Sequence, residues 1–147
     1  MADFSPPNLV GFADIRTQAI DDWQEYRQAG RQFLDLAETA FRNKNAIFTT
    51  TILYNLIAMA IEKLVMSRLM ALGRLPYNHT MHDLVAALEE WRPAVVQGMA
   101  ASLRALDSYQ EICDPYTSTS RTPTPAEIES MLGLARQLEQ RLETDAA

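Results

Sequence analysis

The segment from Ala46 to Leu72 constrains the fold most, because it holds neither Gly nor Pro and is apolar on two sides. One apolar set follows helical spacing and consists of Ile47, Tyr54, Ile57, Ile61, Leu64, Val65 and Leu69. A second set lies on another face and consists of Ile52, Leu56, Met59, Met66 and Met70. A helix that is apolar on two faces must be covered on two faces. The segment is therefore either the central helix of a bundle or part of a subunit interface.

The ends of this helix carry recognisable signals. Asn45 is expected to cap its start, because the side-chain oxygen can accept an orphan N–H of the first turn. Gly73 is expected to end it. Residues 74–79, which include Pro76, are then expected to form a loop.

The preceding segment is expected to be helical from about Asp14 to Arg42. Its clearest apolar stripe consists of Phe33, Leu36, Ala37, Ala40 and Phe41. Gly30 is expected to mark a bend or a break in this helix. Residues 1–13 begin with a Pro-containing stretch and are assigned to an N-terminal arm.

A short helix and a long helix are expected after the loop. Thr80 can cap the short helix, Met81 to Glu90, and Asp83 adds a favourable charge near its start. Its buried residues are expected to be Leu84, Val85 and Leu88. Pro93 can open the next helix, since its missing N–H costs nothing at the first position. That helix is expected to run to about Ile112, with Val95, Val96, Met99, Leu103, Leu106 and Tyr109 directed inward.

The last helix follows a segment, Asp114 to Thr124, that is rich in Pro, Ser and Thr and is expected to be a mobile loop. Thr124-Pro125-Ala126-Glu127 combines a cap, a Pro at the first position and a Glu at the third, which is typical of a helix start. The helix is expected to bury Ile128, Met131, Leu132, Ala135, Leu138 and Leu142. The sequence thus predicts an all-α, antiparallel up-and-down bundle of four long helices plus a short one. The domain covers residues 14–143, with a tail at 144–147.

Composition limits the class of protein. A chain of 147 residues with 48% hydrophobic and 22% charged residues is long enough, and apolar enough, to form one globular domain. The net charge of −6 disfavours general nucleic-acid binding, because such a surface repels phosphates. One cysteine, Cys113, excludes an internal disulfide. No signal peptide is apparent, and residues 46–61 are too short and too polar to span a bilayer, so we expect a cytoplasmic protein.

The order of these elements resembles the HEPN domain, a small helical bundle, over roughly Trp23 to Glu143. The residues that carry the resemblance are Phe33-Leu34-Asp35-Leu36-Ala37-Glu38, Ile61-Glu62-Lys63-Leu64, His82-Asp83-Leu84 and Leu106-Asp107-Ser108-Tyr109, with the closing helix around Ala135 to Leu142. The chain departs from the family at Met59 and Met66, where many members carry Gln and Lys. Cys113-Asp114-Pro115-Tyr116 stands where Arg-Tyr-Pro is often found.

The resemblance implies a candidate catalytic pair. HEPN ribonucleases carry an Arg followed, four to six residues on, by a His, which together could hold a phosphate beside a general acid or base. Arg74 and His79 meet this spacing. Leu75 follows the Arg in place of a polar residue, and the pair lies in the loop after the second helix rather than in a later helix. The alternative is an exposed loop Arg and His without a catalytic role.

His82 and Asp83 invite two interpretations. His79 and His82 could share a cation, but the chain has no further His, and the helix start at Thr80 separates the two. No metal site and no cofactor are therefore expected. The favoured interpretation is structural, with His82 packing and hydrogen-bonding in the first turn to anchor the short helix.

Other side chains could line a nucleotide or partner site. This candidate site comprises His82, Asp83, Lys63, Tyr109 and Tyr116, and the tyrosines could stack on a base. Ordinary packing at the rim of the bundle is the alternative for both tyrosines. Glu62 is expected to form an ion pair with Arg68 or Lys63. The methionines Met59, Met66, Met70 and Met81 fit either an adaptable groove or core and dimer packing, which we favour.

Three functions are compatible with the sequence. The first is a non-catalytic HEPN-like interaction module that forms a homodimer and binds a nucleotide or a partner nucleotidyltransferase, as the resemblance implies. The second is a toxin-like ribonuclease that uses Arg74 and His79. The third is a helical scaffold without a ligand. The acidic charge and the incomplete motif favour the first and third, and the two apolar faces of the 46–72 helix predict a homodimer.

Overall fold

The computed structural model describes residues 19–109 and 121–146, and all regular elements in these ranges are helices. They are α1 (Trp23–Arg42), α2 (Thr50–Ala71), α3 (Met81–Trp91), α4 (Pro93–Val96), α5 (Ala100–Ala105), the 3-10 helix η1 (Leu106–Tyr109) and α6 (Pro125–Ala146). The prediction of an all-α fold is confirmed.

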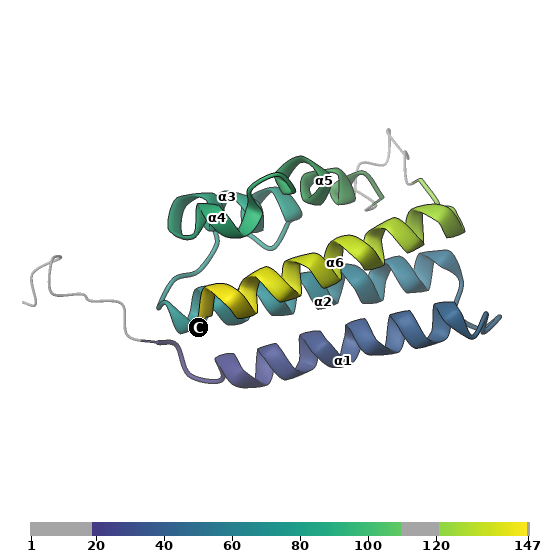
Figure 1. Cartoon of the computed structure of the whole chain (residues 1–147), viewed down its shortest axis with the longest axis horizontal. Coiled ribbons are helices and arrows are strands. Elements are labelled where there is room, and N and C mark those ends of the chain that lie inside the picture. Colours follow the sequence, from purple (N-terminus) through teal and green to yellow (C-terminus); the bar gives the residue numbers. More distant parts are fainter. Residues whose placement is uncertain (1–18, 110–120, 147) are drawn as a thin grey trace, which may run out of the picture.

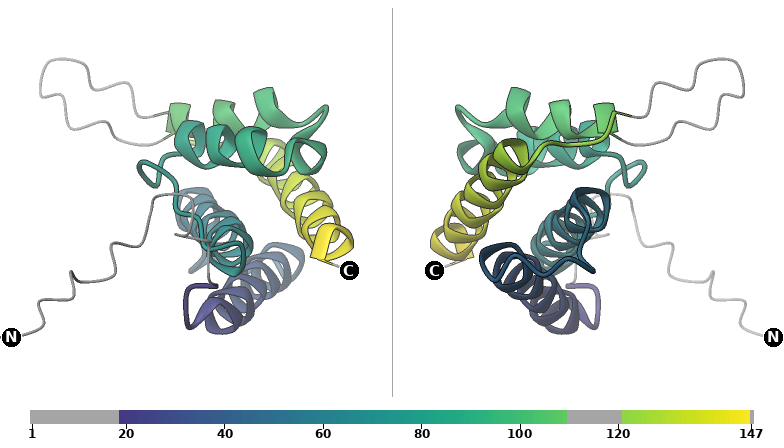
Figure 2. Two further views of the ribbon diagram at one scale, coloured as in Figure 1. Left: turned by 90° about the vertical axis from the view of Figure 1, so that its left-hand side faces the viewer. Right: turned by 90° about the vertical axis from the view of Figure 1, so that its right-hand side faces the viewer.

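Three long helices form the body of the molecule. α1 and α2 run antiparallel, and α6 lies beside them in the same direction as α2 (Figure 1). The short helices α3, α4 and α5 form a second layer against α2 and α6, which the end-on views show clearly (Figure 2). α2 packs against α1, α3 and α6, so it is the central helix of the bundle.

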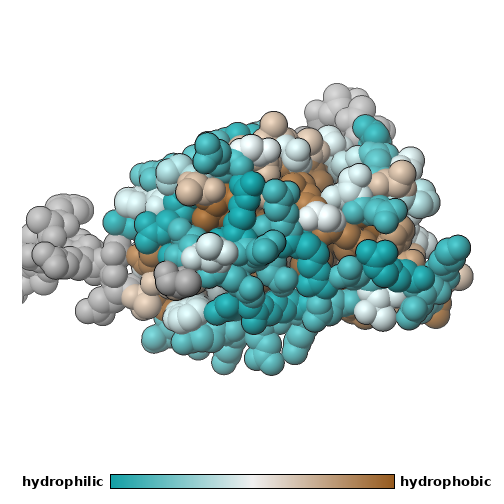
Figure 3. Space-filling model, viewed as in Figure 1, coloured by the Kyte–Doolittle hydropathy of each residue, from teal (hydrophilic) through white to brown (hydrophobic). Residues whose placement is uncertain are grey.

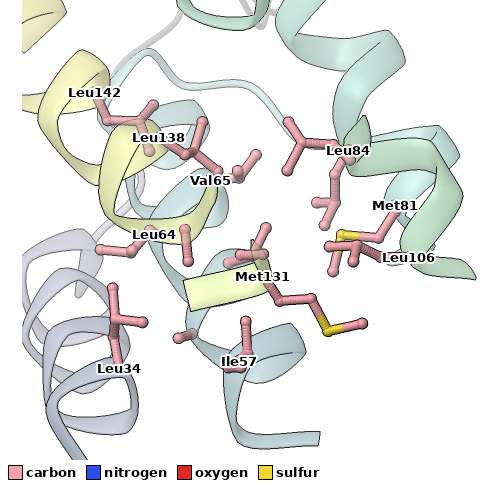
Figure 4. Close-up of a cluster of buried hydrophobic side chains, with 14 of the residues drawn as sticks. Leu34, Ile57, Leu64, Val65, Met81, Leu84, Leu106, Met131, Leu138 and Leu142 are labelled. Atoms are coloured by element: carbon pink, nitrogen blue, oxygen red, sulfur yellow. The ribbon is translucent and has the colours of Figure 1, made fainter. Parts of the chain in front are cut away.

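The core fills the space between the three long helices and continues between these helices and the layer of short helices. Side chains from all three long helices point into the core, as do side chains from α3 and η1 (Figure 4). Those of the long helices include Leu34 of α1, Ile57 and Leu64 of α2, and Met131 and Leu138 of α6. Burial of each such side chain contributes about 1.5–3 kcal/mol. The expected buried residues of the last helix are all buried in α6.

Helix α1 begins later than the sequence suggested. Residues 19–22 are not helical, Asp22 has a left-handed φ of 69°, and residues 14–18 lie outside the described part. The N–H of Ile20 donates instead to the carbonyl of Met70 (2.8 Å), which ties this segment to α2. The expected break at Gly30 is also wrong, because α1 is continuous and Gly30 is buried at the crossing with α2.

Helix α2 begins at Thr50 rather than at Ala46. Thr49 is the cap, and its hydroxyl accepts the N–H of Ile52 (3.2 Å). Asn45 accepts the N–H of Ile47 (3.1 Å) and so closes a turn before the helix instead of capping it. The expected stop is confirmed, since Gly73 has a φ of 69° and donates its N–H to the carbonyl of Met70.

The predicted long helix from Pro93 to about Ile112 does not exist as one element in the described residues. Pro93 does occupy a first helical position, but Gly98 has a φ of 78° and separates α4 from α5. A left-handed residue cannot continue a right-handed helix, and Gly adopts it without steric cost. The chain then tightens into η1, and residues 110–112 lie outside the described ranges.

The start of α6 confirms the expected signal. Glu127 donates its N–H to the hydroxyl of Thr124 (3.2 Å), and its carboxylate accepts the N–H of Thr124 (3.3 Å), which is a reciprocal capping box. α6 extends to Ala146, beyond the predicted domain end at residue 143. Most of the expected mobile loop before Thr124 lies outside the described residues.

Candidate functional site

Arg74 and His79, the expected catalytic pair, are each engaged by a different partner. The guanidinium carbon of Arg74 lies 3.6 Å from the centre of the Trp91 ring, a cation–π contact with the end of α3. His79 instead places its Nδ1 2.6 Å from a carboxylate oxygen of Glu62 on α2. The arginine and the histidine are thus fixed by α3 and α2 respectively.

The charged residues of α2 have other partners than the sequence suggested. Arg68 donates to the carboxylate of Asp145 (2.7 Å) near the end of α6. The Nζ of Lys63 lies 4.2 Å from the centre of the Tyr26 ring on α1. Because Glu62 contacts His79, the expected ion pair of Glu62 with Arg68 or Lys63 is wrong.

His82 meets Asp107 of η1 at the start of α3. Its Nδ1 lies 2.5 Å from the Asp107 carboxylate, which also accepts the backbone N–H groups of Met81 (2.9 Å) and His82 (3.1 Å). The expected hydrogen bond is present, but the His82 side chain is 62% exposed, so the expected packing is wrong. Asp107 is the residue that anchors the short helix.

Asp83 also stabilises the start of α3, through contacts with Thr80 in the first turn of the helix. Thr80 accepts its N–H (3.2 Å), which confirms the predicted cap, and the Thr80 hydroxyl donates to the Asp83 carboxylate (2.9 Å). His79 and His82 hold different carboxylates. Across residues 19–109 and 121–146, no three His, Cys, Asp or Glu side chains gather in a way that could hold a metal ion.

Tyr109 belongs to a polar cluster between η1 and α6. Its ring lies 5.4 Å from that of Tyr54, and its hydroxyl donates to the carboxylate of Glu127, which Arg121 also contacts (2.6 Å). The hydrogen bond to Glu127 raises the pKa of Tyr109, and the same bond lowers the pKa of Glu127 to about 2, with help from Thr124 and Arg121. The Tyr109 hydroxyl is thus hydrogen-bonded to α6 and helps to hold that helix against η1. Tyr116, its expected companion, lies outside the described residues.

One side of α1 and α2 carries exposed apolar residues. Leu36 is 46% exposed, Ile52 41% and Met59 40%, and Leu56 is half-buried between the latter two on α2. We call this set the α1–α2 outer face. Leu36 belongs to the expected apolar stripe of α1, and Ile52 and Met59 belong to the second face of α2, which was expected to be covered by the bundle or by a subunit interface. Among the described residues, α6 and α3 pack against other sides of the pair. Met66 and Met70 are buried, as expected for core packing.

The side of α1 that faces α6 carries charged residues, which form ion pairs with α6. Arg136 of α6 contacts Asp35 (2.7 Å) and Glu38 (2.5 Å) of α1, and these contacts lower the pKa of Glu38. Burial disfavours the charge of Arg136, but the hydrogen bonds to Asp35 and Glu38 raise its pKa overall. Hydrophilic residues cover the lower part of this side of the molecule (Figure 3).

Trp91 and Asp107 are the two contact residues that sequence reasoning missed as partners of Arg74 and His82. Each is far along the chain from the residue it contacts, so spacing carried no signal for either. Asp107 does lie in a motif that contributed to the family resemblance.

Comparisons of this chain with protein-family models, with curated proteins and with solved structures found no match. Within the described residues, no helix has the length and apolar character needed to cross a membrane.

Proposed function

We propose that this chain is a non-catalytic helical interaction module that self-associates through its α1–α2 outer face. The observation that carries the proposal is the exposure of Leu36, Ile52 and Met59, which lie on two antiparallel helices that pack against each other. Contiguous exposed apolar residues of this kind mark interaction surfaces in other proteins.

The distribution of charge supports a second copy as the partner. Arg27, Arg31, Asp35 and Glu38 all turn towards α6, where they form ion pairs. Helical periodicity places Ala29, Gln32, Phe33, Leu36 and Thr39 on the other side of α1, where the one charged residue is the exposed Glu25 near the start of the helix. Two chains that each carry a net charge of −6 repel least where they meet through a surface with few charges.

A charge placed in the outer face tests the proposal. Met59→Glu should weaken self-association about tenfold or more, because the carboxylate would have to be desolvated in the interface. Leu75→Glu is the matched control, since Leu75 is 61% exposed and lies in the loop after α2. Light scattering on both variants should give a monomer for Met59→Glu and the mass of the unaltered protein for Leu75→Glu. Equal masses for the two variants would contradict the proposal.

The resemblance to the HEPN family supports a wider form of the proposal. In this form the module also binds a nucleotide or a partner nucleotidyltransferase, as the resemblance implies. The residues that support it are those of the Ile61-Glu62-Lys63-Leu64 and His82-Asp83-Leu84 segments. Lys63 and His82 both lie near the surface. The Nζ of Lys63 is 4.2 Å from the centre of the Tyr26 ring, and the Nδ1 of His82 is 2.5 Å from the Asp107 carboxylate.

RNA cleavage is the alternative function, and one contact favours it. The Glu62 carboxylate orients His79 through Nδ1, which leaves Nε2 for proton transfer, as in many catalytic histidines. Against it, Arg74 lies on the Trp91 ring rather than beside the imidazole.

We therefore expect the purified protein to leave a labelled single-stranded RNA intact. Gel analysis of the RNA after incubation measures this. Cleavage that disappears in His79→Ala, with helical content unchanged by circular dichroism, would establish the alternative instead.

A further inference from the structure

A pocket of about 240 Å³ opens between the start of α1, the end of α2 and the end of α6. The start of α1 and the end of α6 lie at the same end of the molecule (Figure 1). Its apolar lining is formed by Trp23, Leu64, Ala71 and Leu142, and Ser67, only 3% exposed, also lines it. Three arginines, Arg27, Arg31 and Arg68, also line the pocket, together with the carboxylates of Glu139 and Glu143. The Glu139 carboxylate is paired with Arg136 (3.3 Å). A small apolar pocket with a few convergent polar groups is the usual form of a ligand site.

The three arginines are held differently. Arg68 is 15% exposed and donates both to the Asp145 carboxylate (2.7 Å) and to the Asp145 carbonyl (3.1 Å), so it is fixed as a structural contact. Arg27 and Arg31 are 37% and 40% exposed, and both pair with the same oxygen of Glu143. One carboxylate thus lies between two guanidinium groups at the edge of the pocket.

The Glu143 carboxylate is only weakly held between Arg27 and Arg31, so that another anion can displace it. Glu143 lies in the C-terminal part of α6, where the helix dipole disfavours negative charge. Its side chain is 44% exposed, and ion pairs that are this open to water contribute little. A ligand acid that also brings apolar area into the pocket can therefore replace it.

We propose that this pocket binds a small anion with an apolar body. The acidic group of the ligand takes the place of the Glu143 carboxylate between Arg27 and Arg31, and its body lies against Leu64 and Leu142. The volume of about 240 Å³ limits the ligand to a small molecule. This site is on the α6 side of α1 and does not depend on self-association.

Titration calorimetry with octanoate tests the proposal, with 1-octanol and acetate as probes that lack the charge or the apolar body. Octanoate should bind about tenfold or more tightly than either control. Arg31→Gln and Arg27→Gln should each weaken octanoate binding, whereas Glu143→Gln should strengthen it several-fold, because the internal competitor is gone. The opposite signs separate a ligand site from a merely structural ion pair.

Glu89→Gln is the matched control, because Glu89 is 45% exposed and pairs with Arg104 away from the pocket. It should leave octanoate affinity unchanged. The proposal is overturned if 1-octanol binds as tightly as octanoate, if Glu143→Gln fails to strengthen binding, or if neither the unaltered protein nor Glu143→Gln binds octanoate.

Discussion

The carboxylate of Asp107 holds the start of α3 more firmly than the imidazole of His82 does. The first N–H groups of a helix have no acceptor within the helix, and Asp107 accepts two of them, from Met81 and His82. The N–H of Asp83 goes to Thr80. The His82 side chain adds one contact to the same carboxylate but is 62% exposed.

Substitution of the two partners should therefore have unequal effects. Asp107→Ala should lower the free energy of unfolding by about 1–3 kcal/mol, because it leaves helix N–H groups without an acceptor. His82→Ala should lower it by less than about 1 kcal/mol, as for other exposed ion pairs. Urea denaturation of both variants measures the difference. A larger loss for His82→Ala than for Asp107→Ala would show that the imidazole is the anchor.

At the scale of elements, Gly30 determines how closely α1 approaches α2. A Cβ on this residue would lie 2.8 Å from Cγ of Leu64 and 3.1 Å from the carbonyl oxygen of Ala60. To accept it, the Leu64 side chain would have to shift and the backbone of α2 at Ala60 would have to give way. The residue that looked like a weak point of the helix is thus required by its packing.

Two glycine substitutions test this interpretation. Gly30→Ala should destabilise the protein by about 1–3 kcal/mol, since overpacking outweighs the better helix propensity of Ala. Gly133→Ala is the matched control in α6, where a new Cβ would meet nothing within 4 Å, and it should stabilise by up to about 1 kcal/mol. Thermal unfolding followed by circular dichroism measures both. A stabilising Gly30→Ala would refute the close-packing argument.

The elements differ in how far the sequence could predict them. Local signals were sufficient for the caps at Thr80 and Thr124 and for the stop at Gly73, because each depends on residues within one turn. The break at Gly98 could not be predicted, since Gly is tolerated inside helices and no local signal shows that α4 and α5 each pack separately against α3. The cap at Thr49 had a local competitor in Asn45.

The candidate site was harder to predict than the fold. The hydrogen bond expected for His82 is present, but its partner comes from η1. For His79 the sequence offered a catalytic role or an exposed loop position, and its contact with Glu62 of α2 was not predicted. The pocket beside Arg27 and Arg31 is closed by Glu143, more than a hundred residues along the chain from both, so no local pattern indicates it.

At the scale of the whole molecule, α1 separates two kinds of surface. On one side its charged residues pair with Arg136 and Glu143 of α6. On the other side lies the α1–α2 outer face, with Leu36 and Met59 exposed. A monomer would leave this apolar side in water, whereas a symmetric dimer would cover the same residues in both copies.

Sedimentation velocity of the unaltered protein over a micromolar concentration series tests this central claim most directly. The account predicts a species with twice the 16.6 kDa mass of one chain, whose fraction rises with protein concentration. A single species with the mass of one chain over the whole series would contradict it.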